Sequence, residues 1–179
     1  MLLALVGITG VGKSFLCDKI CEKLNFKKVN TIRTRKPRAG ENVNNFKTIS
    51  ELDELEKQGE IAYRFKVFGG EYAYLSSEIQ SNENWIFEMH YTTIFDWKNI
   101  RPDIKTIYIF PKSVEMAKQK LHERGLSAEK ETERFNEIDE HIEAMKNENL
   151  KNQFDYFFYN DYTDDSVEKL INLVKKIIE

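Results

Sequence analysis

The chain has 179 residues, of which 41% are hydrophobic and 32% are charged, as is typical of a folded globular protein. With 27 Lys and Arg against 30 Asp and Glu, the net charge is −3, which argues against a globally basic nucleic-acid binder and leaves only a local basic cluster to consider. The opening apolar run, residues 2–6, is too short to span a membrane and lacks the charged start of a signal peptide, so we expect a cytoplasmic protein.

The first third of the chain predicts a strand, a turn, a helix and a second strand. The continuous apolar run 2–6 is typical of a strand buried on both faces in a parallel sheet. A glycine-rich turn covers 7–12, and apolar residues at helical spacing predict a helix over 13–24. Residues 26–32 predict the next strand, and the proline-containing basic stretch 33–40 that follows is expected to be irregular.

The middle of the chain predicts one short helix and several strands. The helix is expected to begin at Ser50, with Asp53 as its capping-box partner. Residues 61–75 are rich in aromatics and are interrupted by a glycine pair, which indicates a hairpin or two short strands. Two further core strands are predicted at 85–89 and 104–110.

The last third predicts three helices and one strand. Apolar spacing indicates helices over 114–121 and 135–150, with a short strand at 156–159 between the second and the final helix. We expect Asp165 to cap the final helix, whose inner face would extend to Ile178. Because strands alternate with helices throughout, the sequence predicts an α/β fold with a mainly parallel sheet.

The turn after the first strand carries a phosphate-binding motif. Residues 7–14 read G-x-x-x-x-G-K-S, with every fixed position of the P-loop filled. Glycines let the backbone wrap around phosphate oxygens, and the start of the next helix adds partial positive charge. Lys13 is expected to reach the β and γ phosphates of a nucleoside triphosphate and Ser14 to supply an oxygen to Mg²⁺. The residues expected to bind this triphosphate are Gly7, Thr9, Gly10, Val11, Gly12, Lys13 and Ser14.

A second cluster of positive charge follows the second predicted strand. Arg33, Arg35, Lys36 and Arg38 lie within six residues of an otherwise acidic chain. Arginine can grip a phosphate through two hydrogen bonds, so this cluster could bind the phosphate that accepts the transferred group. A solvated charged surface explains the spacing equally well, and binding of an RNA backbone is a lesser third option.

These residues resemble the guanylate kinase family. The segment 31–41 is similar to the signature after the second strand of that family, with its arginines, proline and Gly-Glu pair. Arg124 with Gly125 resembles the start of the lid, Arg134 matches a lid-flanking arginine, and Asn160 with the following Asp resembles the pair after the last strand. The resemblance implies a P-loop NTPase three-layer fold in a single domain, 1–179. Its parts would be a core (1–33 and 85–179), a lobe that binds the monophosphate (34–84) and a lid (125–131).

The resemblance also implies roles for individual residues. Thr31, Arg35 and Arg38 would hold the acceptor phosphate, Arg124 and Arg134 would stabilise charge on the transferring group, and Asn160 would lie near the adenine of ATP. The family reaction transfers the γ-phosphoryl group of ATP to a nucleoside monophosphate, with GMP or dGMP favoured here. The residues expected to be catalytic are Lys13, Arg35, Arg38, Arg124 and Arg134. We expect a monomer or a homodimer that binds neither nucleic acid stably nor a membrane.

The chain departs from the family where the acceptor base is read. Aligning 68–72 on the family motif F-x-G-N-Y puts Arg64 where the family has a base-reading glutamate. The same alignment puts Ala73 in place of a phosphate-binding tyrosine and Leu75 in place of a base-reading Ser or Thr. A slip of one register would instead bring in Tyr72 or Tyr74, and Glu60 or Glu71 could supply the carboxylate. After the third core strand, Glu88 and His90 replace two family aspartates. The residues expected near the acceptor are Thr31, Arg35, Arg38, Arg64, Tyr72, Tyr74, Glu88 and His90.

Two other functions stay open at this point. The departures at the base-reading positions favour a catalytically inactive, guanylate-kinase-like module that holds a protein partner, whereas the intact Lys13 and Ser14 argue against it. A kinase for another nucleotide or another small phosphorylated acceptor is the remaining alternative. Phosphoryl transfer needs positioning and charge neutralisation more than a strong base, so the departures need not abolish catalysis.

Overall fold

The computed structural model describes residues 1–37, 42–67 and 69–179. Its strands are β1 (Leu2–Gly7), β2 (Lys27–Lys28), β3 (Ile32–Arg33), β4 (Ile61–Val67), β5 (Gly70–Leu75), β6 (Trp85–Glu88), β7 (Lys105–Pro111) and β8 (Tyr156–Asn160). Its α-helices are α1 (Lys13–Lys23), α2 (Ile49–Lys57), α3 (Ser76–Ile79), α4 (Ile94–Ile100), α5 (Val114–His122), α6 (Ala128–Ala144), α7 (Glu148–Lys151) and α8 (Asp164–Ile178). Single 3-10 turns cover Val43–Asn45 and Tyr91–Thr93.

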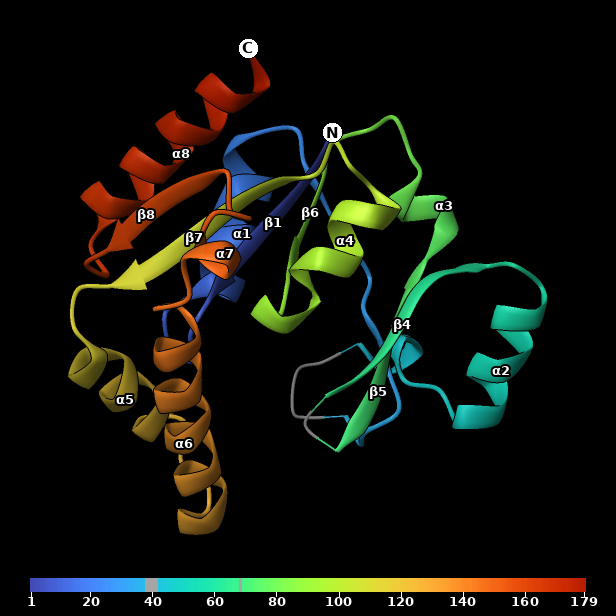
Figure 1. Ribbon diagram of the computed structural model, residues 1–179, viewed down its shortest axis with the longest axis horizontal. Coiled ribbons are helices and arrows are strands. Elements are labelled where there is room, and N and C mark those ends of the chain that lie inside the picture. Colours follow the sequence, from blue (N-terminus) through green and yellow to red (C-terminus); the bar gives the residue numbers. More distant parts are fainter. Residues whose placement is uncertain (38–41, 68) are drawn as a thin grey trace.

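The centre of the molecule is a parallel sheet with the strand order β2-β6-β1-β7-β8 (Figure 1). Strand β1 lies in the middle, and all six of its residues are buried, as the apolar run predicts. Helices cover both faces, so the α/β prediction with a parallel sheet and three layers is confirmed. Because all strands point the same way, the loop after β1 lies at their carboxyl ends, where ligands bind in open α/β sheets.

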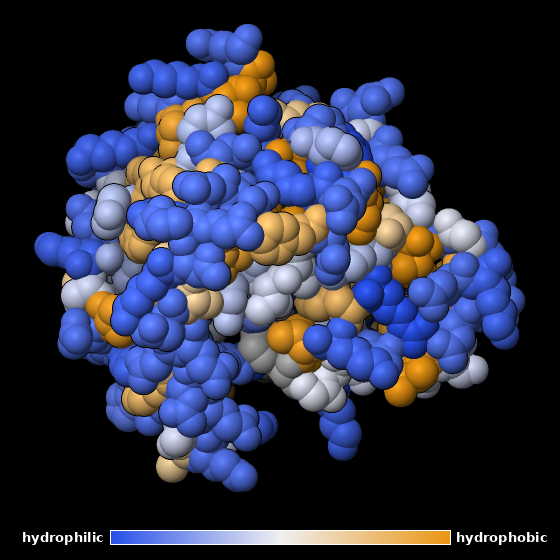
Figure 2. Space-filling model, viewed as in Figure 1, coloured by the Kyte–Doolittle hydropathy of each residue, from blue (hydrophilic) through white to orange (hydrophobic). Residues whose placement is uncertain are grey.

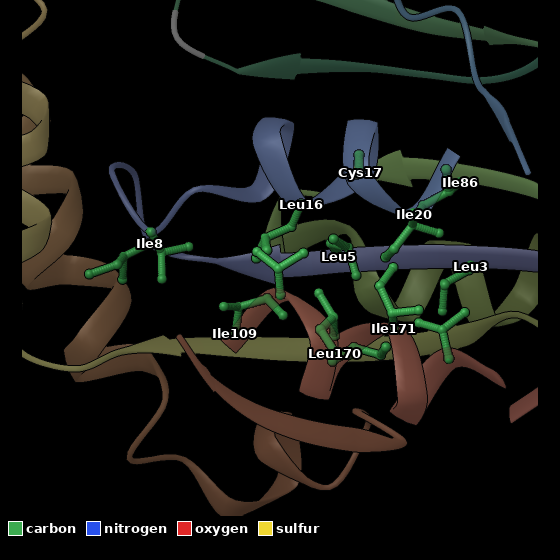
Figure 3. Close-up of a cluster of buried hydrophobic side chains, with 14 of the residues drawn as sticks. Leu3, Leu5, Ile8, Leu16, Cys17, Ile20, Ile86, Ile109, Leu170 and Ile171 are labelled. Carbon is green, nitrogen blue, oxygen red and sulfur yellow. The ribbon is translucent and has the colours of Figure 1, made fainter. Parts of the chain in front are cut away.

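The two faces of the sheet carry separate apolar cores. On one face, alternate β1 residues Leu3 and Leu5 pack with Leu16 and Ile20 of α1 and with Leu170 of α8 (Figure 3). On the other face, Leu2, Ala4 and Val6 pack with Phe87 of β6 and with Trp97 of α4. Since successive strand residues point to opposite faces, one short strand contributes to both cores and fixes the start of the phosphate-binding loop between them.

A second sheet is formed by the part of the chain between β2 and β6. Its strand order is β3-β5-β4, and all of its pairings are antiparallel. Strands β4 and β5 form the hairpin that the glycine pair predicts, and α2 packs on one side of it through Leu52 (Figure 1). The hairpin and α6 both extend past the carboxyl ends of the parallel strands (Figure 1).

Two expectations in the first half were wrong. The strand predicted over 26–32 is two short strands in different sheets, because the chain leaves the parallel sheet after β2 and joins the second sheet at β3. The helix expected to begin at Ser50 begins at Ile49, and its capping box joins Thr48 to Glu51 rather than Ser50 to Asp53. The Thr48 hydroxyl accepts from the backbone N–H of Glu51, whose carboxylate accepts from the backbone N–H of Thr48.

Three expectations in the second half were also wrong. The helix predicted over 135–150 is two helices, α6 and α7, because Asn147 caps a new helix with its side-chain oxygen. The final helix is capped by the Thr163 hydroxyl, with Asp165 in its first turn. Ile178 is 45% exposed, so the buried face of α8 ends at Val174. Helices α3 and α4 were not predicted.

Most of the surface on the face drawn in Figure 2 is hydrophilic, with apolar side chains scattered over it. Within the described residues, no helix combines the length and the apolar character needed to cross a membrane.

Candidate active site

The loop between β1 and α1 is fixed by close backbone approaches. A Cβ on Gly7 would lie 2.5 Å from the carbonyl oxygen of Ile109 in β7, and one on Gly10 would lie 2.3 Å from that of Ala117 in α5. Both glycines also have positive φ, at 152° and 87°. Any side chain would clash at either position, so these glycines let the loop pack against β7 and α5, a requirement separate from contact with phosphate.

Lys13 is folded back over this loop. Its Nζ donates to the carbonyl oxygens of Gly7 at 2.8 Å and Ile8 at 2.9 Å. Burial lowers the pKa of Lys13, and the charges of Arg124 and Arg134 lower it further, whereas Glu88 raises it. The ammonium group therefore lies among these three charged side chains, from β6, from the turn after α5 and from α6. The remaining predicted loop residues, Thr9, Val11, Gly12 and Ser14, complete the turn into α1, where Ser14 is exposed.

Asn160, at the end of β8, contacts the same loop from outside. Its side chain is 3% exposed, and Nδ2 donates to the carbonyl oxygen of Val11 at 2.9 Å. Its Oδ1 accepts from the backbone N–H of Tyr162 at 3.0 Å. Both ends of the amide are thus used within the protein.

The lid-side arginines are placed differently from each other. Arg124 is exposed in the turn after α5, whereas Arg134 is half-buried on α6 and pairs with Glu137 at 2.6 Å. Both act electrostatically on Lys13, and Arg134 also acts on His90. The structure therefore brings Lys13, Glu88, His90 and these two arginines, expected from separate segments, into one electrostatic neighbourhood.

A histidine and tyrosine cluster lies beside Lys13, and most of its members were not predicted as site residues. His141 of α6 stacks on Tyr91 at 4.0 Å between ring centroids, and its Nε2 lies 3.1 Å from the hydroxyl of Tyr108. His90 is 6.3 Å from His141, ring to ring, and its Nδ1 lies 2.7 Å from the Thr92 hydroxyl. Burial lowers the pKa of His90 to about 4 and that of His141 to about 3, so both rings are neutral near pH 7. The spacing of apolar residues along α6, at intervals of three and four, predicts only that His141 lies on the buried face of the helix.

The basic segment after β3 is ordered by an aromatic ring. The guanidinium groups of Arg33 and Arg35 lie 6.0 and 5.3 Å from the Phe46 ring. Arg33 Nη1 donates to the carbonyl oxygen of Thr31 at 3.2 Å, and the Arg35 Cβ packs near Gly70 at the start of β5. Arg38, the other expected phosphate ligand, lies outside the described residues.

The two faces of the β4–β5 hairpin have different chemistry. Tyr63, Phe65 and Tyr74 form one face, which packs on the parallel-sheet core: Trp97 lies 5.3 Å from Tyr63 and 5.1 Å from Tyr74, between ring centroids. Tyr72 stacks on Phe65 at 5.6 Å on the same face. Tyr74 is 2% exposed and its hydroxyl donates to the carbonyl oxygen of Glu88 at 3.4 Å. Tyr72 and Tyr74, the tyrosines that a shift of one register would bring to the acceptor, therefore lie on the hairpin face that packs on the parallel-sheet core.

The opposite face of the hairpin is an ion-pair cluster against α2. Arg64 lies opposite Ala73 in the ladder, and its guanidinium contacts Asp53 at 2.7 Å, Glu56 at 2.9 Å and Glu71 at 2.5 Å. Lys66 also pairs with Glu71, at 3.1 Å. Arg64 is thus held by three carboxylates. Glu71 is held by two cations, whereas Glu60 is exposed at the start of the hairpin.

The donors around the loop suit a hard cation. The Ser14 hydroxyl lies at the start of α1, and the Glu88 carboxylate is near enough to raise the pKa of Lys13. Mg²⁺ prefers oxygen ligands and is bound through one or two protein groups together with substrate phosphates. These two side chains fit that requirement.

Comparison with known proteins gives consistent matches along the chain. A family model described as guanylate kinase matches residues 1–177. Guanylate kinases of Wolbachia pipientis wMel and Clostridioides difficile (strain 630) are 28% and 26% identical to the chain; the alignments cover 98% and 97% of this chain and 90% and 86% of those proteins.

Two solved structures share the fold. A guanylate kinase from Anaplasma phagocytophilum superposes with a TM-score of 0.72 at 20% identity, over 98% of this chain and 85% of that one. A shikimate kinase from Bacteroides thetaiotaomicron gives 0.56 at 17% identity, over 99% and 98%.

Proposed function

Because this chain belongs to the guanylate kinase family, we propose that it is a phosphotransferase that converts ATP and GMP to ADP and GDP. An oxygen of the GMP phosphate forms a bond to the γ-phosphorus of ATP, and the bond from that phosphorus to the β,γ-bridging oxygen breaks. The electron pair leaves with ADP. Almost all of the catalysis is positioning and charge neutralisation.

The donor side is carried by the loop between β1 and α1. Lys13 exchanges its two carbonyl partners in the loop for β and γ phosphate oxygens when ATP binds. Arg124 and Arg134, which already act on Lys13, add positive charge where the transferring group develops negative charge. Ser14, with Glu88 nearby, would hold Mg²⁺, which neutralises phosphate charge and orients the oxygens.

The acceptor side is carried by the lobe 34–84 and by Thr31. Arg35, steadied by the Phe46 ring, binds the GMP phosphate together with Arg38. The lid, 125–131, closes over both nucleotides and excludes water, which would otherwise compete as acceptor. GMP and dGMP are the favoured acceptors, and the chain acts in the cytoplasm as a monomer or a homodimer.

The single observation that carries this proposal is the position of Lys13, half-buried in a complete phosphate loop and within electrostatic reach of Arg124 and Arg134. ADP formation, coupled to NADH oxidation, is to be measured with GMP, dGMP, IMP, AMP, CMP and UMP. We expect turnover with GMP. Folded protein that binds ATP and turns over none of these acceptors would contradict the proposal.

A further inference from the structure

The phosphate loop needs hydrogen-bond donors on its outer side. When the N–H groups of such a loop point inward to a phosphate, its carbonyl groups point outward and must find partners. Leu16 of α1 donates its N–H to the carbonyl oxygen of Gly12, and Lys13 donates to those of Gly7 and Ile8. The carbonyl groups of Gly10 and Val11 lie between these two sets.

The carbonyl groups of Gly10 and Val11 are both met by the segment after β8. Asn160 Nδ2 donates to the Val11 oxygen at 2.9 Å, and the Tyr162 hydroxyl donates to the Gly10 oxygen at 3.4 Å. The approach is close, because a Cβ on Gly12 would lie 3.2 Å from Asn160 Nδ2. The Asn160 amide is itself oriented by the backbone N–H of Tyr162 on Oδ1.

Tyr162 reaches this position at a conformational cost. Its φ is 65°, and among the residues that the structure describes it is the sole non-glycine with positive φ. For a bulky side chain this conformation is unfavourable, because the Cβ approaches the following carbonyl oxygen. A strained tyrosine that contacts a ligand loop is a sign of function rather than of chance packing.

We propose that Asn160 and Tyr162 are positioning residues for the phosphate loop. This inference rests on the proposed function. Their contacts are to the carbonyl oxygens of Val11 and Gly10, which belong to the loop that surrounds the phosphates. Loss of either contact should therefore weaken every ligand that carries the triphosphate, whatever its base.

The test compares donors that share phosphates and differ in the base. Dissociation constants for ATP, ITP and inorganic tripolyphosphate, each with Mg²⁺, are to be measured by calorimetry on the parent and on Asn160→Leu. This substitution keeps the side-chain volume and removes the N–H group that donates to Val11. We expect all three ligands to weaken by the same factor, on the order of tenfold, because one buried hydrogen bond is lost. The KM for GMP should stay unchanged while the KM for ATP rises.

Other outcomes overturn the inference. Weakened ATP with unchanged tripolyphosphate would mean that Asn160 reads the base, and unchanged affinity for all three would mean that it does not position the loop. Asn152→Asp, at an exposed site after α7, is the control for a substituted asparagine.

If Asn160→Leu does not fold, Tyr162→Phe decides, because it keeps the ring and removes only the hydroxyl. An equal loss for the three ligands supports the proposal, and an unchanged set of affinities defeats it. Binding is measured without turnover, so failure of the proposed GMP kinase activity would be seen separately in the coupled assay.

Discussion

At the scale of single residues, Lys13 shows how a charged side chain is kept ready for a ligand. Its ammonium group lies on two carbonyl oxygens, and it forms no ion pair with any residue that the structure describes. Carbonyl groups are neutral acceptors, and a phosphate oxygen forms a stronger, charge-assisted hydrogen bond with an ammonium group. The exchange of partners on binding is therefore favourable.

Lys13→Ala tests this role. We expect kcat for ADP formation to fall on the order of a hundredfold or more, because a positioned donor to developing charge is lost. Lys19→Ala, in the same helix and paired with Glu22, is the matched control and should keep kcat. Circular dichroism and urea unfolding are to show that both variants stay folded; equal activities of the two variants would remove Lys13 from the mechanism.

At the scale of elements, the hairpin and α2 are joined by charge as well as by apolar contact. Arg64 is largely enclosed, with 15% of its side chain exposed, and Glu71 beside it has 9%, whereas Asp53 and Glu56 are about half exposed. Exposed ion pairs contribute little to stability, but a buried carboxylate that loses its partner is costly. The pair between Arg64 and Glu71 should therefore dominate this cluster.

Arg64→Ala is expected to lower the free energy of unfolding by about 1–3 kcal/mol, since among the described residues the Glu71 carboxylate then keeps Lys66 alone as a partner. Glu56→Ala should cost under about 1 kcal/mol. Urea denaturation of both variants measures the difference. Equal losses would show that Arg64 is not a structural clamp, and an altered GMP to IMP preference in Arg64→Ala would give it a role in reading the base.

The same elements show what the sequence could predict. The phosphate loop was predictable residue by residue, because its geometry is local and its glycines, Lys13 and Ser14 are contiguous. The face of the hairpin on which each side chain lies was not predictable, because a shift of one residue in the strand pairing moves Tyr72 and Tyr74 from one side of the sheet to the other. The partners of Asn160 could not be predicted either, since Val11 lies far from it in the chain and only the parallel sheet brings them together.

At the scale of the whole molecule, α6 is tied to the core through a neutral histidine. His141 faces Tyr108 of β7 and Tyr91 of the 3-10 turn, with His90 on its other side and Lys13 near enough to lower its pKa. In the unfolded chain its pKa returns to 6.5, whereas in the fold it is about 3. The unfolded state therefore takes up the proton first as the pH falls, and stability is lost below about pH 6.5.

His141→Gln tests this linkage. Between pH 7.5 and 5.5 the parent should lose about 1.4 kcal/mol more stability than the variant, because at pH 5.5 the unfolded histidine is one pKa unit into its protonated form. Urea unfolding at the two pH values gives the comparison. A His141→Gln curve that follows the parent would place the protonated ring inside the fold.

The packing of Trp97 gives the protein its own optical reporter. The chain has two tryptophans, and this one is fully buried between the core and the rings of Tyr63 and Tyr74 on the hairpin. Indole emission shifts in wavelength and intensity when neighbouring rings move or water enters. In a Trp85→Phe background, any movement of the hairpin relative to the parallel sheet on nucleotide binding can therefore be followed in a stopped-flow fluorimeter without any attached dye.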